Sequence, residues 1–429
     1  MLFFRRCFGQ GKNFLDFFGG RDRKHKKLRR EKKMELSDVV VVSVARSPMG
    51  NFGGSMKYLP AVELGGQVIK AAIERAGLKG EQIDMNIYGN CRQAGNGTNP
   101  ARIAGQLGGI PSDKFAITPN CACPTSILAL IMASRAIRLG DADVVTCGGM
   151  ESMSTIPHIV KGHRWDGFRL GNVTLMDGWY DTTDVIAKVS PGMTAEIVAE
   201  KYDVSKDEQD YFAWESHQRA EKAQKEGFFE EEITPIAVPA HGRQEEFIFD
   251  KDETIRYNSK LDKIKKIKPA FKENGTVTAA NACGMPDGAT AMVVMSRERA
   301  NSLGLKPLFH LHSYAQFAVD NEIFGIGPAY SIPIALERGG LTLDDVSFVE
   351  INEAFAATSI ACEKVLELDH EKHNVKGGAI ALGHATGSSG ARITITLYSL
   401  LKHYNKEFGV SSICGGGGVT AALVIGREN

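Results

Sequence analysis

Two reactive side chains near the end of the sequence lie among glycines. His384 falls within Asn374 to Ile393, where five glycines surround it, and Cys414 is followed directly by Gly415 to Gly418. Glycine runs permit positive φ and let the backbone come close to another group. A short apolar run, here Ala379 to Leu382, followed by a glycine turn and a helix is where α/β proteins build active sites. We therefore expect His384 and Cys414 to take part in chemistry rather than in core packing alone.

A third reactive group, Cys123, immediately precedes an apolar segment that begins near Ser126. The N-terminus of a helix carries roughly half a positive charge, which lowers the pKa of a thiol and stabilises the thiolate. Pro124 suits the first helical position, because its missing N–H has no bond to lose there. Cys121 lies in the same turn, and we expect it to pack as a small apolar residue. A nucleophilic Cys123, a general-base histidine and a second cysteine indicate acyl transfer through a thioester.

The elements that position these residues occur twice along the chain. Near the C-terminus, the His384 turn leads to a predicted helix at Gly390 to Tyr404, a strand at Val410 to Ile413 and then Cys414. In the first half, Cys147 holds the place of Cys414. The first-half predictions are strands at 39–44, 83–88 and 143–146 and helices at 63–76, 100–107 and 126–139. The repeat predicts an α/β protein whose duplicated βαβ halves pack as layers around buried helices.

A polar segment with several prolines separates the two copies and includes a charged helix predicted at Lys206 to Gly227. An excursion of this length on an α/β core is typical of a lid or binding subdomain. We predict an N-terminal half at 34–153 plus 268–300, an inserted loop subdomain at 154–267 and a C-terminal half at 301–429. Residues 1–33 form a basic extension outside the fold.

The composition is that of an ordinary globular protein of two or three domains, with 429 residues, 43% hydrophobic and 24% charged. The 51 lysines and arginines balance the 51 aspartates and glutamates, so the overall charge gives no argument for nucleic acid as a partner. No apolar run reaches the roughly 18 to 20 residues of a membrane helix. The chain has 8 cysteines, and in so long a sequence they indicate neither a disulfide framework nor a zinc site. We expect no metal and a reducing compartment.

The basic extension allows three interpretations. Such a block is usually a solvated tail. It is also compatible with a mitochondrial transit peptide, although it is poor in serine and its basic residues cluster. Alternatively, translation begins at Met34, immediately before the first predicted strand. We expect a cytoplasmic protein, with the mitochondrial matrix as the alternative if residues 1–33 are a transit peptide.

With these elements in place, the sequence resembles the thiolases, the family of acetyl-CoA acetyltransferases and 3-ketoacyl-CoA thiolases. The matching tracts span nearly everything from about residue 38 onward, in family order. The most specific are EINEAFAA at Glu350 to Ala357, GGAIALGHATGSSGARI at Gly377 to Ile393, and CGGGG at Cys414 to Gly418. The resemblance implies the five-layered α/β/α/β/α thiolase fold with an inserted loop subdomain that binds CoA and makes oligomer contacts.

The resemblance also implies a role for each site residue. Cys123 is the nucleophile that becomes acylated, and His384 takes its proton. Cys414 acts as acid and base at the α-carbon of the acetyl unit, so the enolate oxygen needs stabilisation. Asn352 holds a water that, with the histidine, stabilises this oxygen. The backbone N–H groups of Cys123 and Gly416 form a second oxyanion hole, where a Cβ at Gly416 would crowd the acyl group.

Several positions depart from the family pattern. Pro124 and Thr125 replace the small residues and serine that usually follow the nucleophile, and Ala385 replaces a proline, which leaves that turn less rigid. The serine that touches the pantetheine arm in many thiolases corresponds to Cys283. A His-Met pair of the acyl pocket corresponds to Ser190 and Pro191. The residues expected to bind the substrate are Cys283, Phe355, Ser190, Pro191 and Met193.

The resemblance therefore predicts the type of reaction more firmly than the length of the acyl chain that the enzyme prefers. The first hypothesis is interconversion of two acetyl-CoA with acetoacetyl-CoA plus CoA. A longer-chain 3-ketoacyl-CoA thiolase of fatty-acid β-oxidation is the alternative, since a few kcal/mol of pocket contacts decide chain length. A third hypothesis is a non-catalytic CoA-binding protein of the same fold. Condensing enzymes of fatty-acid synthesis share the fold but lack Cys414 in its glycine run.

The resemblance implies acyl-CoA and CoA as substrates, with no separate cofactor, no nucleic acid and no membrane partner. Family members are dimers or tetramers, so we expect a homodimer or homotetramer. Basic residues of the middle segment are available for the CoA phosphates, although each is also explained as a solvated surface charge. They are His163, Arg164, Arg169, Lys188, Arg219 and Lys222.

Overall fold

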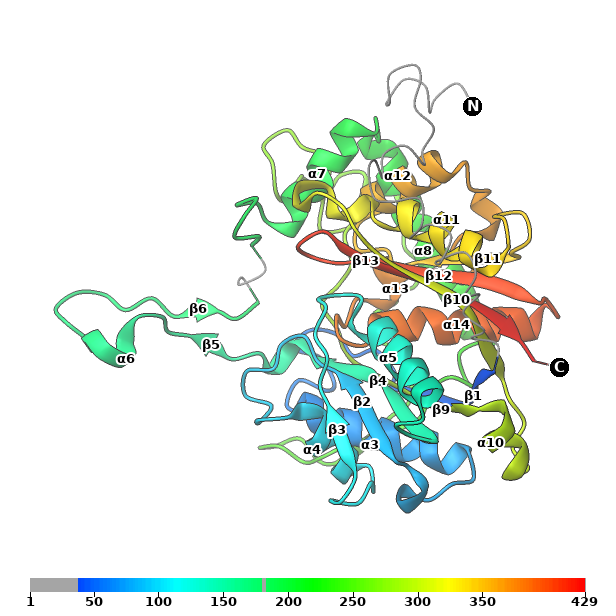
Figure 1. The fold of residues 1–429 in the computed structure, drawn as a ribbon. Helices are drawn as coiled ribbons and strands as arrows, with labels where there is room; N and C mark the ends of the chain where they lie inside the picture. Colours follow the sequence, from blue (N-terminus) through cyan, green and yellow to red (C-terminus); the bar gives the residue numbers. More distant parts are fainter. Residues whose placement is uncertain (1–37, 180–182, 429) are drawn as a thin grey trace, which may run out of the picture. The chain divides into compact units, whose positions relative to one another are not determined.

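The computed structural model describes residues 38–179 and 183–428, and the basic extension at 1–33 lies outside them. Figure 1 shows the course of the chain. The strands are β1 (Val39–Arg46), β2 (Met85–Gly89), β3 (Phe115–Ile117), β4 (Val144–Ser152), β5 (His158–Ile159), β6 (Met176–Asp177), β7 (Ile236–Val238), β8 (Phe247–Phe249), β9 (Asp287–Ser296), β10 (Phe309–Ala318), β11 (Phe348–Ile351), β12 (Phe408–Cys414) and β13 (Val419–Arg427).

The helices confirm the predicted alternation of strand and helix. They are α3 (Ala61–Arg75), α4 (Pro100–Leu107), α5 (Thr125–Leu139), α6 (His163–Asp166), α7 (Pro191–Lys201), α8 (Lys206–Lys225), α9 (Leu261–Ile264), α10 (Arg297–Ser302), α11 (Pro328–Gly339), α12 (Ala356–Leu366), α13 (Ala379–Leu382) and α14 (Ser389–His403). Short 3₁₀ turns occur at η2 (Gly80–Gln82), η3 (Met153–Thr155), η5 (Asn321–Ile326) and η6 (His370–Lys372).

The sheet topology shows the duplication. The main strands follow the order β11-β12-β13-β10-β1-β9-β4-β2-β3. On one side, β3, β2 and β4 are parallel, whereas β9 and β1 join antiparallel. On the other side, β11 and β12 are parallel, whereas β13 and β10 join antiparallel. The halves meet at β1 and β10, which share only the pairs Val40–His310 and Val41–Phe309.

Successive side chains of a strand point to opposite faces of the sheet, so they pack into different apolar clusters and the chain forms layers. Val40 of β1 faces the cluster under α3 and α4, whereas Val39 and Val41 face the cluster around α5 and α14. In β13, Leu423 faces that same central cluster and Val424 faces the cluster under α11 and α12. Three apolar clusters therefore hold five layers together, α/β/α/β/α, and the central cluster covers both sides of the middle layer of α5 and α14 (Figure 1).

α5 is buried along most of its length because its sequence is apolar on nearly all sides, as predicted. It packs against α14, the corresponding helix of the other half. Each helix begins where its half carries a predicted catalytic residue: Cys123 precedes α5, and His384 precedes α14. The pairing of the two buried helices therefore brings both turns to the same end of the central layer.

One local prediction, the equivalence of Cys147 and Cys414, needs correction. The Cys147-Gly148-Gly149 tract lies inside β4 and does not form a turn. Cys147 is the fourth residue of β4, whereas Cys414 is the last residue of β12, so the two cysteines are not equivalent. The strand continues because Gly149 lets it lie against the His384 loop; an added Cβ would meet the Gly387 carbonyl oxygen at 2.0 Å.

The apolar run Ala379 to Leu382 forms one turn of helix, α13. It packs against α8, and its four residues are buried. Four apolar residues fit a buried strand or a buried helical turn equally well, so the pattern alone does not separate them.

The polar middle segment combines two kinds of structure. α7 and α8 pack against α12, and α8 also contacts α13, next to the His384 loop. By contrast, β5, α6 and β6 lie apart from the layers in Figure 1 and carry highly exposed apolar side chains, among them Trp165, Phe168 and Leu170.

Candidate active site

The nucleophile turn is held by its own side chains. The Thr125 hydroxyl donates to the Ala122 carbonyl (2.6 Å) and accepts from the Cys121 N–H (2.8 Å), and Asn120 Oδ1 accepts from the Ala122 N–H. Ala122 takes a left-handed conformation, with φ 50°, which is uncommon for a residue with a Cβ. Pro124 is the N-cap of α5 rather than its first helical residue. This turn aims Cys123 into the region where the other predicted residues gather.

Burial raises the pKa of the Cys123 thiol to about 11, which differs from the lowered value that the helix N-terminus predicts. The N–H of Gly416 and the charge of Arg92 act in the opposite direction but do not overcome desolvation. Cys123 is therefore a thiol in the unliganded protein. It becomes a nucleophile only if a nearby base accepts its proton.

His384 has the geometry of such a base. Its Nδ1 lies 2.7 Å from the Ser389 hydroxyl, which itself donates to the Ala385 carbonyl (2.9 Å). Because that hydroxyl proton is used, Nδ1 carries the donating proton and Nε2 keeps a free lone pair. Nε2 is buried and has no hydrogen-bond partner among the described residues. Burial, with a contribution from Arg392, lowers the pKa of His384 to about 3, so the ring is neutral.

Asn352 lies beside the histidine ring, with its Nδ2 3.5 Å from Nδ1 of His384. This distance makes the contact weak at best. Asn352 Oδ1 is buried and has no hydrogen-bond partner among the described residues. The loop is fixed from behind by Glu353, whose carboxylate accepts from the Ser216 hydroxyl (2.7 Å) and the Ile380 N–H (3.0 Å). The asparagine is thus held rigidly with spare hydrogen-bonding capacity next to His384.

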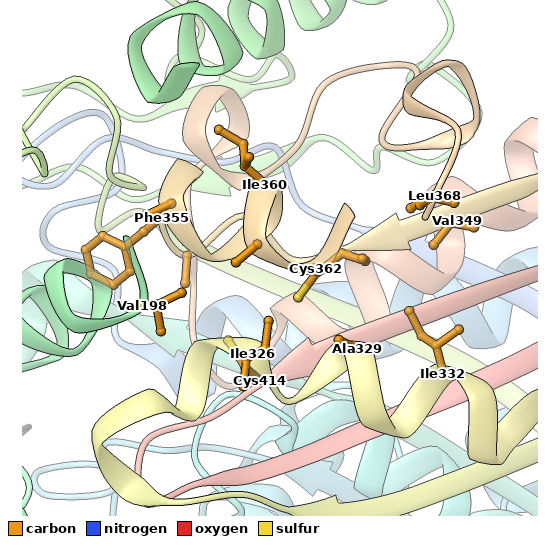
Figure 2. Close-up of a cluster of buried hydrophobic side chains, with 14 of the residues drawn as sticks. Val198, Ile326, Ala329, Ile332, Val349, Phe355, Ile360, Cys362, Leu368 and Cys414 are labelled. Atoms are coloured by element: carbon orange, nitrogen blue, oxygen red, sulfur yellow. The ribbon is translucent and has the colours of Figure 1, made fainter. Parts of the chain in front are cut away.

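Cys414 ends β12, and the glycines after it turn directly into β13. Figure 2 shows Cys414 at the border of the C-terminal apolar cluster, near Cys362 and Ile326. Burial, and then the charge of Cys123, raises the pKa of the Cys414 thiol well above its usual range. Once deprotonated, such a thiol is a strong base.

The glycine turn lies against the nucleophile. A Cβ at Gly415 would meet Pro124 Cδ at 2.5 Å, and the Gly416 N–H faces the Cys123 sulfur. A Cβ at Gly416 would meet no heavy atom within 4 Å, so open space lies beside this amide. That space is where an acyl group on Cys123 would be placed.

The predicted substrate-binding residues fall into two groups. Cys283 and Phe355 lie at the site: the Cys283 N–H donates to the Ala354 carbonyl (3.1 Å), and its thiol pKa is raised to about 12 by burial and by Cys123. Phe355 meets Phe271 edge to face, with ring centroids 6.2 Å apart.

Ser190, Pro191 and Met193 form the start of α7. The Ser190 hydroxyl accepts from the Met193 N–H (3.4 Å), and Pro191 occupies the first helical position. Capping explains Ser190 and Pro191 without a substrate, and a role of these three residues in substrate binding stays a prediction.

The sequence analysis missed residues of the loop after β2. The Cys91 sulfur lies 3.1 Å from the Ala122 carbonyl and 3.4 Å from the Thr125 hydroxyl, and Arg92 follows it. It also missed Ser389 as the partner of His384 and Glu151 as the carboxylate that accepts from the Gly387 N–H (3.0 Å). The signal for the loop was present, because polar residues directly after a parallel strand often reach an active site.

Among residues 38–179 and 183–428, no group of three or more His, Cys, Asp or Glu side chains is arranged to hold a metal ion. In the same part of the chain, no helix combines the length and apolar character that crossing a membrane requires.

Comparisons with known proteins identify the family of this chain. The family models described as "Thiolase, N-terminal domain" and "Thiolase, C-terminal domain" match residues 39–298 and 305–427. An acetyl-CoA acetyltransferase of Cupriavidus necator is 45% identical over 395 residues, which cover 92% of this chain and 100% of that protein. A probable acetyl-CoA acyltransferase of Staphylococcus aureus is 43% identical over 394 residues, covering 91% of this chain and 100% of its own length.

Solved structures agree. The Bacillus anthracis acetyl-CoA acetyltransferase has a TM-score of 0.89 and 40% identity, covering 92% of this chain and 99% of that one. Human mitochondrial 3-ketoacyl-CoA thiolase in complex with CoA has a TM-score of 0.88 and 37% identity, covering 92% and 99%. The layered fold, the two matching domain models and these identities together show that the chain belongs to the thiolase family.

Proposed function

We propose that the protein is an acyltransferase that interconverts two acetyl-CoA with acetoacetyl-CoA plus CoA through an acyl-cysteine at Cys123. One observation carries the proposal: Cys123 lies against the Gly416 amide, with a neutral His384 and the buried thiol of Cys414 contributed by separate elements of the other half. The relatives from Cupriavidus necator and Bacillus anthracis carry the name acetyl-CoA acetyltransferase.

In the first half-reaction, His384 Nε2 takes the thiol proton of Cys123 while the sulfur attacks the carbonyl carbon of acetyl-CoA. The oxyanion that forms accepts from the N–H groups of Cys123 and Gly416. The carbon–sulfur bond to CoA then breaks, and His384 returns the proton to the CoA sulfur. Acetyl-Cys123 and free CoA result, with the histidine neutral again.

In the second half-reaction, Cys414 gives its thiol proton to the neutral His384, and the resulting thiolate removes an α-proton from another acetyl-CoA. The enolate oxygen is stabilised on the side of His384 and Asn352, where Asn352 has unused hydrogen-bonding capacity. The α-carbon attacks the acetyl carbonyl, the bond to the Cys123 sulfur breaks, and His384 gives the proton that it holds to the Cys123 sulfur. The burial that raises the pKa of Cys414 makes its thiolate basic enough for this step.

The two other hypotheses are less favoured. A longer-chain thiolase of β-oxidation is named among the structural neighbours, but relatives at 45% and 44% identity are named acetyl-CoA acetyltransferase. A non-catalytic CoA-binding protein has no need of a neutral histidine with a free Nε2 beside two cysteines.

The decisive experiment is single-turnover acylation with acetyl-CoA, followed by peptide mass spectrometry. We expect one acetyl group on the peptide that carries Cys123, lost in Cys123→Ser and kept in Cys121→Ser. An unlabelled protein, or a label that Cys121→Ser removes, would reject the proposal.

Acyl-CoA and CoA are the proposed substrates, and the reaction above needs no separate cofactor. We also propose a homodimer or homotetramer. β3 ends the sheet with its outer edge unpaired among the described residues, and Phe115 and Leu107 beside it are 60% and 54% exposed. The exposed apolar residues of the β5–β6 segment support further contacts. Light scattering after size exclusion would give the number of subunits.

The division into halves at 34–153 plus 268–300 and 301–429, with an inserted subdomain at 154–267, also remains a proposal. The family models change over between residues 298 and 305, which supports the second boundary. We propose a reducing compartment and, with it, the cytoplasm; imaging of the full chain and of a chain that starts at Met34 would reveal a transit peptide in 1–33.

A further inference from the structure

The guanidinium of Arg92 has no carboxylate as an ion-pair partner in the part of the chain that the structure describes. It follows Cys91 in the loop after β2, where its backbone N–H donates to Glu151 Oε1 (3.1 Å). Its side chain forms no ion pair with any residue of 38–179 or 183–428, and its Nε is buried without a hydrogen-bond acceptor. Leaving a partly buried charge unpaired is unfavourable, which indicates that its partner arrives with the substrate.

The guanidinium is nevertheless held in place. Its central carbon lies 5.7 Å from the centre of the Trp179 ring, a cation–π distance. The backbone carbonyl of Arg92 accepts from Asn96 Nδ2 (3.0 Å), which fixes the loop below it. Arg92 is therefore positioned by contacts that do not use its N–H donors.

The loop that carries Arg92 lies against the nucleophile turn. The Cys91 sulfur donates to the Ala122 carbonyl (3.1 Å), and Asn120 Nδ2 donates to the Cys91 carbonyl (3.1 Å). The charge of Arg92 is close enough to Cys123 to act on its thiol. A group that extends from an acyl chain on Cys123 would thus pass near the guanidinium.

A planar guanidinium with free N–H donors matches a carboxylate bidentately. We propose that Arg92 binds the terminal carboxylate of a short acyl chain, so that the enzyme also accepts 3-oxoacyl-CoA substrates that end in a carboxylate. This inference rests on the proposed thiolase function and names a second substrate class for the same site.

The chemistry is that of the proposed reaction in the cleavage direction. The Cys123 sulfur attacks C3 of 3-oxoadipyl-CoA, and its proton passes to His384. The C2–C3 bond breaks, and Cys414 protonates C2, which leaves as acetyl-CoA. His384 then returns its proton to Cys414. CoA attacks the succinyl thioester and gives its thiol proton to His384, the bond to the Cys123 sulfur breaks, His384 passes this proton to Cys123, and succinyl-CoA is released. Arg92 holds the distal carboxylate while the succinyl group is on Cys123.

The test compares two six-carbon substrates, 3-oxoadipyl-CoA and 3-oxohexanoyl-CoA, which differ in a terminal carboxylate or methyl group. In the wild type we expect kcat/KM to favour the carboxylate by roughly 10- to 100-fold, because a site built around a polar partner rejects the analogue that lacks it. Arg92→Gln should bring this ratio to about 1, and Arg92→Lys should keep part of it, since lysine retains the charge but not the fork.

Arg138→Gln is the matched control, because it also removes one positive charge but lies exposed at the far end of α5. It should leave the ratio as in the wild type. A ratio that is the same in the wild type and in Arg92→Gln would overturn the proposal.

The phosphates of CoA are the other anions that could meet Arg92, and N-acetylcysteamine thioesters of both acyl chains separate the two sources. If Arg92 binds the acyl carboxylate, its effect on the ratio of kcat/KM values should persist with these thioesters, which lack the CoA phosphates. An equal loss with both CoA substrates that vanishes with the short thioesters would assign Arg92 to CoA and refute the proposal. Failure to cleave even 3-oxohexanoyl-CoA or acetoacetyl-CoA would instead count against the thiolase function itself.

Discussion

At the scale of single residues, the site depends on which nitrogen of His384 carries the proton. The chain of hydrogen bonds from Nδ1 through Ser389 to the Ala385 carbonyl leaves Nε2 as the acceptor. Nothing else among the described residues fixes this choice as firmly, because the Asn352 contact is long. Ser389 is thus a positioning residue rather than a catalytic one.

Ser389→Ala should therefore lower kcat by roughly 10- to 100-fold, the usual effect of removing a group that orients a functional histidine. KM for acetoacetyl-CoA should change little, because Ser389 is buried behind the ring. Steady-state kinetics would measure both values, with Ser399→Ala on the same helix as control. An unchanged kcat in Ser389→Ala would show that the hydrogen bond does not set the tautomer.

Cys414 is predicted to serve only the carbon–carbon step. Cys414→Ser should still acquire the acetyl group on Cys123, because His384 and the Gly416 amide remain. Its condensation rate should fall by about 1,000-fold or more, since a hydroxyl is far less able than a thiol to exchange the α-proton. Mass spectrometry of the acetylated peptide and a coupled assay of acetoacetyl-CoA formation would separate the two steps. Loss of acetylation in Cys414→Ser would contradict this division of roles.

At the scale of elements, the site depends on loops of one half lying against strands of the other. β4 of the first half contacts the His384 loop of the second through the Gly149 backbone, where a Cβ would meet the Gly387 oxygen at 2.0 Å. The Glu151 carboxylate accepts from the Gly387 N–H at the same place. The strand and the loop are therefore fixed to each other by a close backbone approach.

Gly149→Ala should destabilise the protein by about 1 to 3 kcal/mol, because an overpacked contact against backbone has little freedom to relax. The displaced loop should also lower kcat. Urea unfolding and steady-state kinetics would test both effects. Gly284→Ala is the control for stability, since a Cβ there meets nothing within 4 Å. Equal stability of the two variants would mean that β4 and the loop separate easily.

At the scale of the whole molecule, the middle segment is tied to the C-terminal half by a cluster of charges. His370 lies between Glu215 of α8 and Glu363 of α12, with its ring nitrogens 2.6 and 2.8 Å from their carboxylates. These two partners raise the pKa of His370 to about 10. α8 also carries Ser216, which holds Glu353 behind Asn352, so this tie supports the catalytic loop.

The raised pKa fixes the direction of a pH effect. A histidine whose pKa is higher in the folded than in the unfolded state stabilises the fold below the unfolded value of about 6.5. This contribution is lost as the pH rises from there towards 10. His370→Gln should therefore flatten the decline of stability between pH 7 and pH 10, whereas His158→Gln on exposed β5 should not. Thermal unfolding at a series of pH values would test this, and parallel curves for the wild type and His370→Gln would refute it.

The sequence by itself determined the alternation of elements and the identity of the predicted site. Apolar periodicity placed the buried helices within a few residues, because a helix buried on all sides has a distinctive composition. The glycines around His384 and after Cys414 pointed to the site, because glycine runs in an α/β chain mark close backbone approach. The repeated order of strand and helix predicted the two halves, and the sheet order agrees.

Only the tertiary structure decided what depends on residues distant in sequence. The pKa of Cys123 rises because burial outweighs the helix N-terminus, and burial is a property of the packed fold. Ser389 and Asn352 both approach Nδ1 of His384 only once α14 and β11 are in place. The loop that carries Arg92 lies against the nucleophile turn because β2 ends and α5 begins at the same place, a juxtaposition that no local pattern encodes.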